Sequence, residues 1–201
     1  MTSSKPYFEA MARQLPSFET GMMPQNRYVF PTFEERTAYG YKRQDPYAKL
    51  FEDRIVFLGV QVDDASADDV MAQLLVLESM DTDSPITMYI NSPGGEVHEG
   101  IAMLNVLRAH PGDVTAIVEG LAASAASFVI IGGANRVIMR PHSEMMLHAP
   151  WTAMEGDAPS LEKGARDLQR LGGTLAAIYA NKAGGTPEHW AGVMSDETWY
   201  T

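Results

Sequence analysis

Apolar positions from about residue 49 onward form short runs separated by polar stretches and turn residues. Residues 55–60 and 86–90 have the length and composition that favour buried strands. Further strands are predicted at residues 114–118, 136–139 and 145–148. The chain therefore offers several short strands, each followed by a segment with a different period.

The segments between the strands carry apolar residues at the spacing of one helix face. Ser66 and Asp69 have the spacing of a capping box and predict that a helix begins there. Val70, Leu74 and Leu77 then share one face of that helix. Other helices are predicted from about residue 97, over residues 120–131 and 160–182, and from about residue 187. Strands that alternate with helices predict an α/β fold with a mainly parallel sheet.

The amino-terminal part has a different pattern. Residues 1–45 contain prolines and scattered aromatic side chains with no sustained period, which favours an extended or flexible arm. The whole chain has 201 residues, a length that suits one domain with a sizeable core.

Charge and composition narrow the classes of function. The net charge of −11 argues against nucleic acid and anionic membranes as partners, since both are polyanions. Cysteine is absent, which excludes disulfides, thiolate zinc sites and thiol nucleophiles, and which fits a cytoplasmic protein. The most apolar stretch, residues 121–131, is too short to span a bilayer. We therefore expect a soluble protein.

Two strand-to-helix turns could carry chemistry. At residues 91–95, Gly94 and Gly95 would let a ligand approach the backbone closely, although a plain tight turn gives the same pattern. In the second turn, Ser124 lies near a helix start among glycine and alanine, where small neighbours leave room for a substrate. An alanine-rich packing helix is the alternative interpretation of that segment.

A serine nucleophile requires a base, and His148 is the best placed of the histidines. It follows the apolar run of the last predicted strand, whereas the other histidines lie beside charges, prolines or turns and are expected to be solvated: His98, His110, His142 and His189. No metalloprotease, P-loop or dinucleotide-binding motif occurs, and no metal site or cofactor is predicted.

Taken together, these segments make the chain similar to the proteolytic-subunit family of Clp protease, ClpP. The resemblance covers about residues 27–201. Its four motifs occur in the family's order: residues 27–31 (RYVFP), 91–95 (NSPGG), 120–126 (GLAASAA) and 146–150 (MLHAP). Up to Gly95 the chain resembles the actinobacterial type, and beyond it phage-type ClpP-like proteases, as in a mosaic. Residues 1–26 are then expected to be a flexible arm or propeptide, and residues 27–201 a single protease domain.

The resemblance implies a role for each site residue. Ser124 would be the nucleophile and His148 the general base. The backbone N–H groups of Gly95 and Ala125 would form the oxyanion hole.

The third member of the triad is less closely defined. The family has an aspartate near the carboxyl end, and an ungapped reading from His148 places Glu197 at that position. Glutamate has one methylene more than aspartate, so its carboxylate lies further from the backbone. Asp196 is the adjacent alternative for the triad acid. Asp196 also replaces an arginine that helps to join two rings in many cellular members. The chain ends at Thr201, where family members continue, so the support of Glu197 is an open point.

The resemblance also implies a fold and an activity. The fold is a spiral of short parallel strands and helices, shared with crotonase-type enzymes, with a protruding helical handle at about residues 160–182. The activity is ATP-dependent hydrolysis of unfolded polypeptides inside heptameric rings, with an AAA+ Clp ATPase as partner and paralogous subunits as an option. Tyr89 lies where the family forms a pocket for that ATPase. A capsid-maturation protease, a catalytically silent ring subunit and a crotonase-type enzyme are the alternatives.

Overall fold

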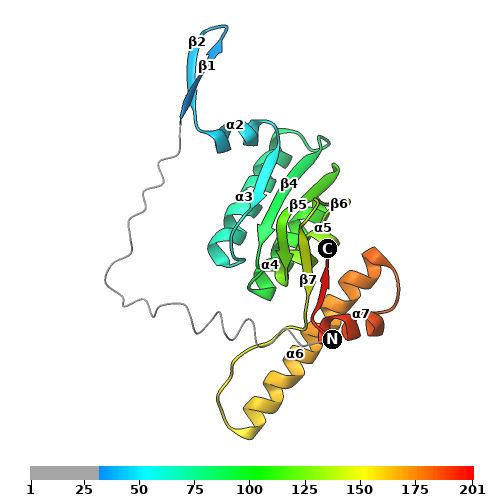
Figure 1. Ribbon diagram of the computed structural model, residues 1–201. Helices are drawn as coiled ribbons and strands as arrows, with labels where there is room; N and C mark the ends of the chain where they lie inside the picture. The colour runs from blue at the N-terminus through cyan, green and yellow to red at the C-terminus, as the bar shows by residue number, and fades with distance from the viewer. Residues whose placement is uncertain (1–31) are drawn as a thin grey trace. The chain divides into compact units, whose positions relative to one another are not determined.

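The computed structural model describes residues 32–201 of the chain (Figure 1). The predicted arm or propeptide over residues 1–26 lies outside this part, and so does the motif at residues 27–31. The described residues divide into two compact units, one that ends at Pro46 and one from Tyr47 to Thr201.

The first unit contains a β-hairpin. Strands β1 (Phe33–Thr37) and β2 (Gly40–Gln44) pair antiparallel, with Thr37 opposite Gly40. The Thr37 hydroxyl donates to the Gly40 carbonyl over 3.1 Å and so closes the turn. The prediction of an irregular arm up to residue 45 is therefore wrong here. Most side chains of the hairpin are exposed, so it has no apolar alternation from which a strand could be predicted.

The second unit is a sheet with helices packed against it. Its strands are β3 (Ile55–Leu58), β4 (Ile86–Ser92), β5 (Val114–Ala123), β6 (Arg136–Met139), β7 (Glu144–Leu147) and β8 (Thr198–Tyr200). The order is β3-β4-β5-β7-β8, β6 also pairs with β5, and only β8 runs antiparallel to its neighbour. The predicted α/β class with a mainly parallel sheet is confirmed.

The helices follow the strands in alternation. They are α2 (Pro46–Glu52), α3 (Asp64–Met80), α4 (Val97–Ala109), α5 (Ala125–Gly133), α6 (Ala158–Ala183) and α7 (Pro187–Ser195). Asp63 is the N-cap of helix α3, and its carboxylate accepts from the Ser66 N–H over 2.8 Å. Ser66 is thus the last residue of the capping box and not its first, as predicted, because its hydroxyl accepts from the Asp63 N–H over 2.9 Å.

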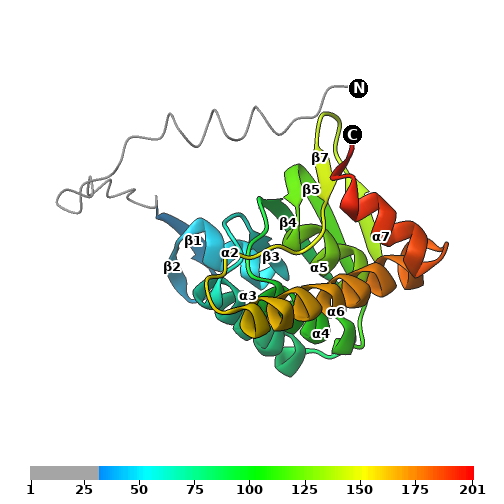
Figure 2. The same ribbon diagram turned by 90° about the horizontal axis from the view of Figure 1, so that it is seen from below.

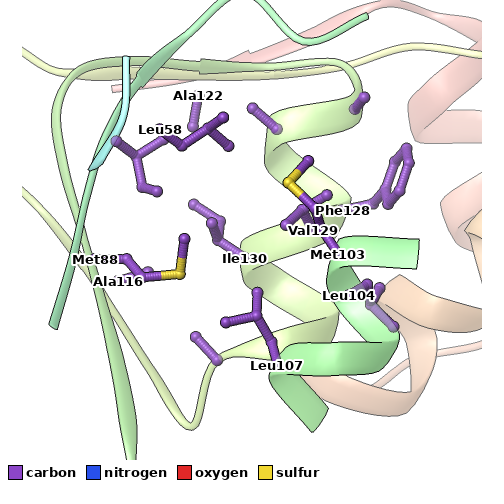
Figure 3. Close-up of a cluster of buried hydrophobic side chains, with 14 of the residues drawn as sticks. Leu58, Met88, Met103, Leu104, Leu107, Ala116, Ala122, Phe128, Val129 and Ile130 are labelled. Carbon is purple, nitrogen blue, oxygen red and sulfur yellow. The ribbon is translucent and has the colours of Figure 1, made fainter. Parts of the chain in front are cut away.

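The core lies between the sheet and helices α4 and α5 (Figure 3). Leu58, Met88 and Ala116 extend from three neighbouring strands and are almost fully buried. They face Met103 and Ile130 of the two helices. Nearly all of α5 is buried, which explains why its sequence is apolar all round.

Helix α6 is the longest element, with 26 residues, and it extends away from the sheet (Figures 1 and 2). Its buried residues, Leu175, Ala176 and Tyr179, all lie in its carboxyl-terminal half, where α6 packs against α5 and α7. The preceding half is exposed along most of its length, in agreement with the expected helical handle. Within residues 32–201, no helix combines the length and apolar character that crossing a membrane requires.

One histidine differs from its predicted environment. His110 is buried, not solvated, and its Nε2 lies 3.3 Å from the Ser84 carbonyl. It caps the end of α4, where the chain turns back under the sheet. The proline that follows it in the sequence suggested an exposed turn, and the tertiary packing of that turn could not be predicted from it.

Candidate active site

The nucleophile segment begins as a strand. Strand β5 pairs with β7 up to Ala123, and the pairing continues one step further, where the Ser124 N–H donates to the Met146 carbonyl over 2.9 Å. The prediction that a helix begins at residue 120 is therefore wrong. Small residues are required here for a different reason: a Cβ at Gly120 would lie 2.8 Å from the Asn91 side chain.

Ser124 is the single residue between strand β5 and helix α5. Its backbone angles, φ 52° and ψ −120°, are unfavourable for a residue with a Cβ. A sharp strand-to-helix turn of this kind lifts a serine side chain out of the sheet at the helix start, as the nucleophile elbow of α/β-hydrolases does. The sequence predicted Ser124 within the first turn of a helix, whereas it is the N-cap residue just before the helix begins.

His148 directly follows β7 and meets Ser124. Its Nε2 lies 2.7 Å from the Ser124 Oγ, which is hydrogen-bond distance. The imidazole is half-buried, and the loss of hydration lowers the pKa of His148 below its usual 6.5, while the Glu197 carboxylate acts in the opposite direction. The pair predicted from the sequence is brought together by the β5–β7 pairing.

Glu197 lies beside His148 because of the pairing of β7 with β8. The register pairs Leu147 with Thr198, so one step along it places Glu197 opposite His148. The Met194 carbonyl ties the two segments together, since it accepts from the N–H groups of Ala149 and Glu197 over 2.9 and 3.2 Å.

The two acidic candidates differ in their environment. Glu197 is half-buried, its backbone φ is 49°, and the Trp199 indole donates to its Oε1 over 3.5 Å. Asp196 is exposed and caps the end of α7. Only the Glu197 carboxylate acts on the pKa of His148. The geometry therefore favours Glu197 over Asp196 as the group that faces the imidazole.

The glycine turn after β4 packs directly against the turn that contains Ser124. A Cβ at Gly94 would collide with the Ala123 carbonyl and lie 2.6 Å from the Ala125 nitrogen. A Cβ at Gly95 would collide with the Val62 carbonyl, and its φ of 154° is one that glycine alone adopts readily. Both glycines are thus required by close backbone approach.

The N–H groups of Ala125 and Gly95 belong to the two turns that meet beside Ser124. Ala125 is the first residue of α5, so its N–H has no acceptor within the helix. The Gly94 carbonyl accepts from the Val62 N–H over 2.9 Å. Because a trans peptide is planar, the Gly95 N–H of the same peptide unit points the opposite way.

A cleft of about 520 Å³ opens at this point. Its lining includes Gly95, Ser124, His148, Pro150 and Trp151. The Ser124 hydroxyl, the His148 imidazole and the two glycines therefore line one space, whose volume is within the range of ligand-binding clefts.

Two residues near the site were missed by the sequence reasoning. Ser127 is fully buried, and its hydroxyl donates to the Ser124 carbonyl over 2.7 Å. The Tyr179 hydroxyl of α6 lies 2.7 Å from the Ser127 Oγ. The spacing of Ser127, three residues after Ser124, was the available signal for the first contact. No local pattern indicates the second, because Tyr179 lies more than fifty residues away.

Comparisons with known proteins agree with this geometry. The Clp protease family model matches residues 38–201. The chain is 50% identical over 159 residues to the ATP-dependent Clp protease proteolytic subunit 2 of Leifsonia xyli subsp. xyli, which covers 78% of this chain and 71% of the relative. It is 45% identical over 168 residues to subunit 1 of Corynebacterium efficiens, with 83% and 81% covered. With subunit 1 of Thermobifida fusca, 42% of 169 residues are identical, and 83% and 76% are covered.

Proposed function

This chain belongs to the Clp protease family, as a proteolytic subunit of the serine-peptidase type, and we propose that Ser124 is its nucleophile and His148 its general base. The observation that carries this assignment is the 2.7 Å contact between the His148 Nε2 and the Ser124 Oγ. A neutral imidazole at that distance can accept the hydroxyl proton as the oxygen attacks.

The reaction follows the acyl-enzyme scheme. The Ser124 oxygen bonds to the scissile carbonyl carbon while its proton passes to His148, and a tetrahedral oxyanion forms. His148 then returns the proton to the leaving amine as the C–N bond breaks. Water, deprotonated by His148, then attacks the acyl carbon, and His148 returns this proton to the Ser124 oxygen as the ester bond breaks. The N–H groups of Gly95 and Ala125 are the proposed donors to the oxyanion, a role supported by the directions in which these two groups point.

Glu197 is the proposed third member of the triad. A carboxylate beside the imidazole stabilises the imidazolium that forms during attack and fixes the ring orientation. The strand register supports the assignment, since the pairing of β7 with β8 places Glu197 opposite His148. An aspartate at the same position would be one methylene shorter.

The substrates, partner and assembly are proposed on the basis of the family. Relatives named ATP-dependent Clp protease proteolytic subunits imply a Clp ATPase that unfolds substrates and delivers them. We expect heptameric rings that enclose the active sites, with α6 at the contact between rings. A cytoplasmic location and the similarity of the second half to phage-type proteases stay predictions.

An aromatic cluster supports the proposed ATPase contact. Phe57 stacks on Tyr89 with ring centroids 5.6 Å apart, and Tyr47 meets Phe57 edge-on at 5.5 Å. Tyr47 is more than half exposed, so the cluster is open to an apolar side chain of a partner.

A fluorophosphonate probe tests the nucleophile and the base. The parent should be labelled, Ser124→Ala should not, and His148→Ala should be labelled at least a hundredfold more slowly. Ser195→Ala and His98→Ala remove exposed residues of the same types and should be labelled like the parent.

Two results would contradict the assignment. Labelling that survives Ser124→Ala would exclude Ser124 as the nucleophile. A well-folded parent that is neither labelled nor active would favour the silent ring subunit.

A further inference from the structure

A hydroxyl relay, formed by the buried side chains of Tyr179 and Ser127, leads from helix α6 to the carbonyl of Ser124. The Ser127 Oγ donates to the Ser124 carbonyl, and this uses the single proton of that hydroxyl. The Tyr179 hydroxyl, 2.7 Å from the Ser127 Oγ, must therefore be the donor in the next bond. The order is thus Tyr179 O–H to Ser127 O–H to Ser124 C=O, in which each bond strengthens the next.

The two hydroxyl groups of the relay lie in a region that solvent does not reach. Ser127 is 0% exposed and Tyr179 is 2% exposed. The Tyr179 ring stacks on Trp190 with centroids 5.6 Å apart, so helix α7 fixes the donor from its other side. Burial also raises the pKa of the Tyr179 hydroxyl, which keeps its proton available at any pH at which the protein is folded.

The relay ends at the Ser124 carbonyl, and this carbonyl determines the direction of the Ala125 N–H group. The Ser124 carbonyl and the Ala125 N–H belong to the same peptide unit, which is planar and trans. Fixing the carbonyl on one side therefore fixes the N–H on the other. Hydrogen bonds accepted by that carbonyl, from the Ser127 O–H and from the Ser127 N–H over 3.0 Å, also polarise the amide and make its N–H a better donor.

We propose that Tyr179 and Ser127 are positioning residues for the oxyanion hole, which orient and polarise the Ala125 N–H through the Ser124 carbonyl. The inference rests on the proposed role of Ala125 in that hole. The Gly95 N–H is oriented in a parallel way, since the Val62 N–H holds the Gly94 carbonyl. The backbone angles of Ser124 are intrinsically unfavourable, so the turn requires such an external hold.

The test compares Tyr179→Phe and Ser127→Ala with a matched control. Ser143→Ala removes a buried hydroxyl that also donates to the carbonyl three residues earlier, that of Arg140, over 2.8 Å. Peptidase kinetics are measured on the whole protein with a neutral peptide. Rates are divided by the number of sites that a fluorophosphonate labels at saturation, so that a partly unfolded sample does not distort the result.

The expected result is a split between kcat and KM. Both relay variants should lower kcat about tenfold, with KM within about twofold, since the lost hold acts on the oxyanion and not on the bound substrate. A peptide aldehyde, whose adduct carries the oxyanion, should bind about tenfold more weakly, while a product peptide binds as before. The acid limb of the pH profile should not move, because His148 is not part of the relay. The double variant should lose no more than about what either single variant loses.

Each other outcome has a clear meaning. Parent values of kcat and aldehyde affinity in Tyr179→Phe would overturn the relay and leave the nucleophile assignment intact. An equal loss in Ser143→Ala would overturn it too, because the effect would then be general loss of a buried hydrogen bond. A parent that is neither labelled nor active would overturn both proposals together.

Discussion

At the level of single residues, the environment of His148 determines the pH range in which the site works. The half-buried imidazole is poorly hydrated, so its pKa is lowered, and the Glu197 carboxylate offsets part of this shift. Only the neutral imidazole can accept the serine proton. With His148 as the proposed base, we therefore expect activity to be absent at low pH and to rise as the pH increases through the pKa of His148.

The first prediction concerns this acid limb. In the parent, kcat/KM should reach half of its plateau below pH 6.5, the usual pKa of histidine. Glu197→Gln removes the charge that raises the pKa, so the limb should move to lower pH while the plateau falls by about a hundredfold or more. A pH series with a neutral peptide measures both. Asp196→Asn is the control and should leave both unchanged; a larger effect at Asp196 would reverse the assignment of the acid.

The second prediction concerns the backbone of Ser124. Ser124→Ala keeps a Cβ at φ 52°, whereas Ser124→Gly removes it. The relief of strain exceeds the entropy that glycine loses on folding, so Ser124→Gly should be the more stable variant by about 1 kcal/mol. Denaturant unfolding of both proteins at equal concentration measures the difference. A glycine variant that is less stable than the alanine variant would contradict the strain argument.

At the level of elements, the turn after β4 is held by backbone contacts that leave no space for a side chain. Gly95→Ala would drive a Cβ into the Val62 carbonyl at an unfavourable φ. We expect a loss of about 2 kcal/mol or more in the free energy of unfolding and a loss of peptidase activity at permissive temperature. Gly192→Ala in helix α7 is the matched control, because a Cβ there meets open space, and it should be neutral or stabilising. Equal effects of the two would contradict the role given to Gly95.

Elements with strong local patterns could be predicted from the sequence. The parallel strand β3 is a fully apolar run and β4 is mainly apolar, and α6 has apolar residues on one face, so their types and approximate bounds followed from the pattern. The meeting of Ser124 and His148 could be predicted from the carboxyl ends of parallel strands, together with the family motifs.

The remaining elements depend on pairing that the sequence does not display. Strand β8 has three residues and exists because it pairs with β7, and the same pairing brings Glu197 to His148. The extension of β5 to Ala123 is apolar and rich in alanine, so its pattern resembles a helix until the β7 partner is known. The bond between Ser127 and Tyr179 joins residues that are distant in the sequence, and no local rule predicts it.

At the level of the whole molecule, the exposed half of α6 is the surface most suited to assembly. Leu161 is 44% exposed near the start of this helix, beside charged residues that form pairs such as Arg166 with Glu162. An exposed apolar side chain on this helix is available for burial in a contact between subunits. The proposed contact between rings would bury it.

The fourth prediction tests that contact. In a parent that assembles as two stacked rings, Leu161→Asp should reduce the mass to that of one ring by native mass spectrometry, because the variant places an unpaired charge in the proposed interface. Met80→Asp makes the same change at an exposed position of α3 and should leave the mass unchanged. The same mass for Leu161→Asp and the parent would exclude this part of α6 from the interface.

The unfavourable backbone at position 124 also has a consequence for the history of such chains. Under the proposed role, serine stands there at a thermodynamic loss because hydrolysis requires its hydroxyl group. A duplicated copy that served merely to complete a ring would be free of that demand. Random substitution would then favour glycine at position 124, because it is the residue that the turn itself prefers. The identity of this one residue in a paralogue therefore records whether the copy still cleaves peptides or has become a passive part of the shell.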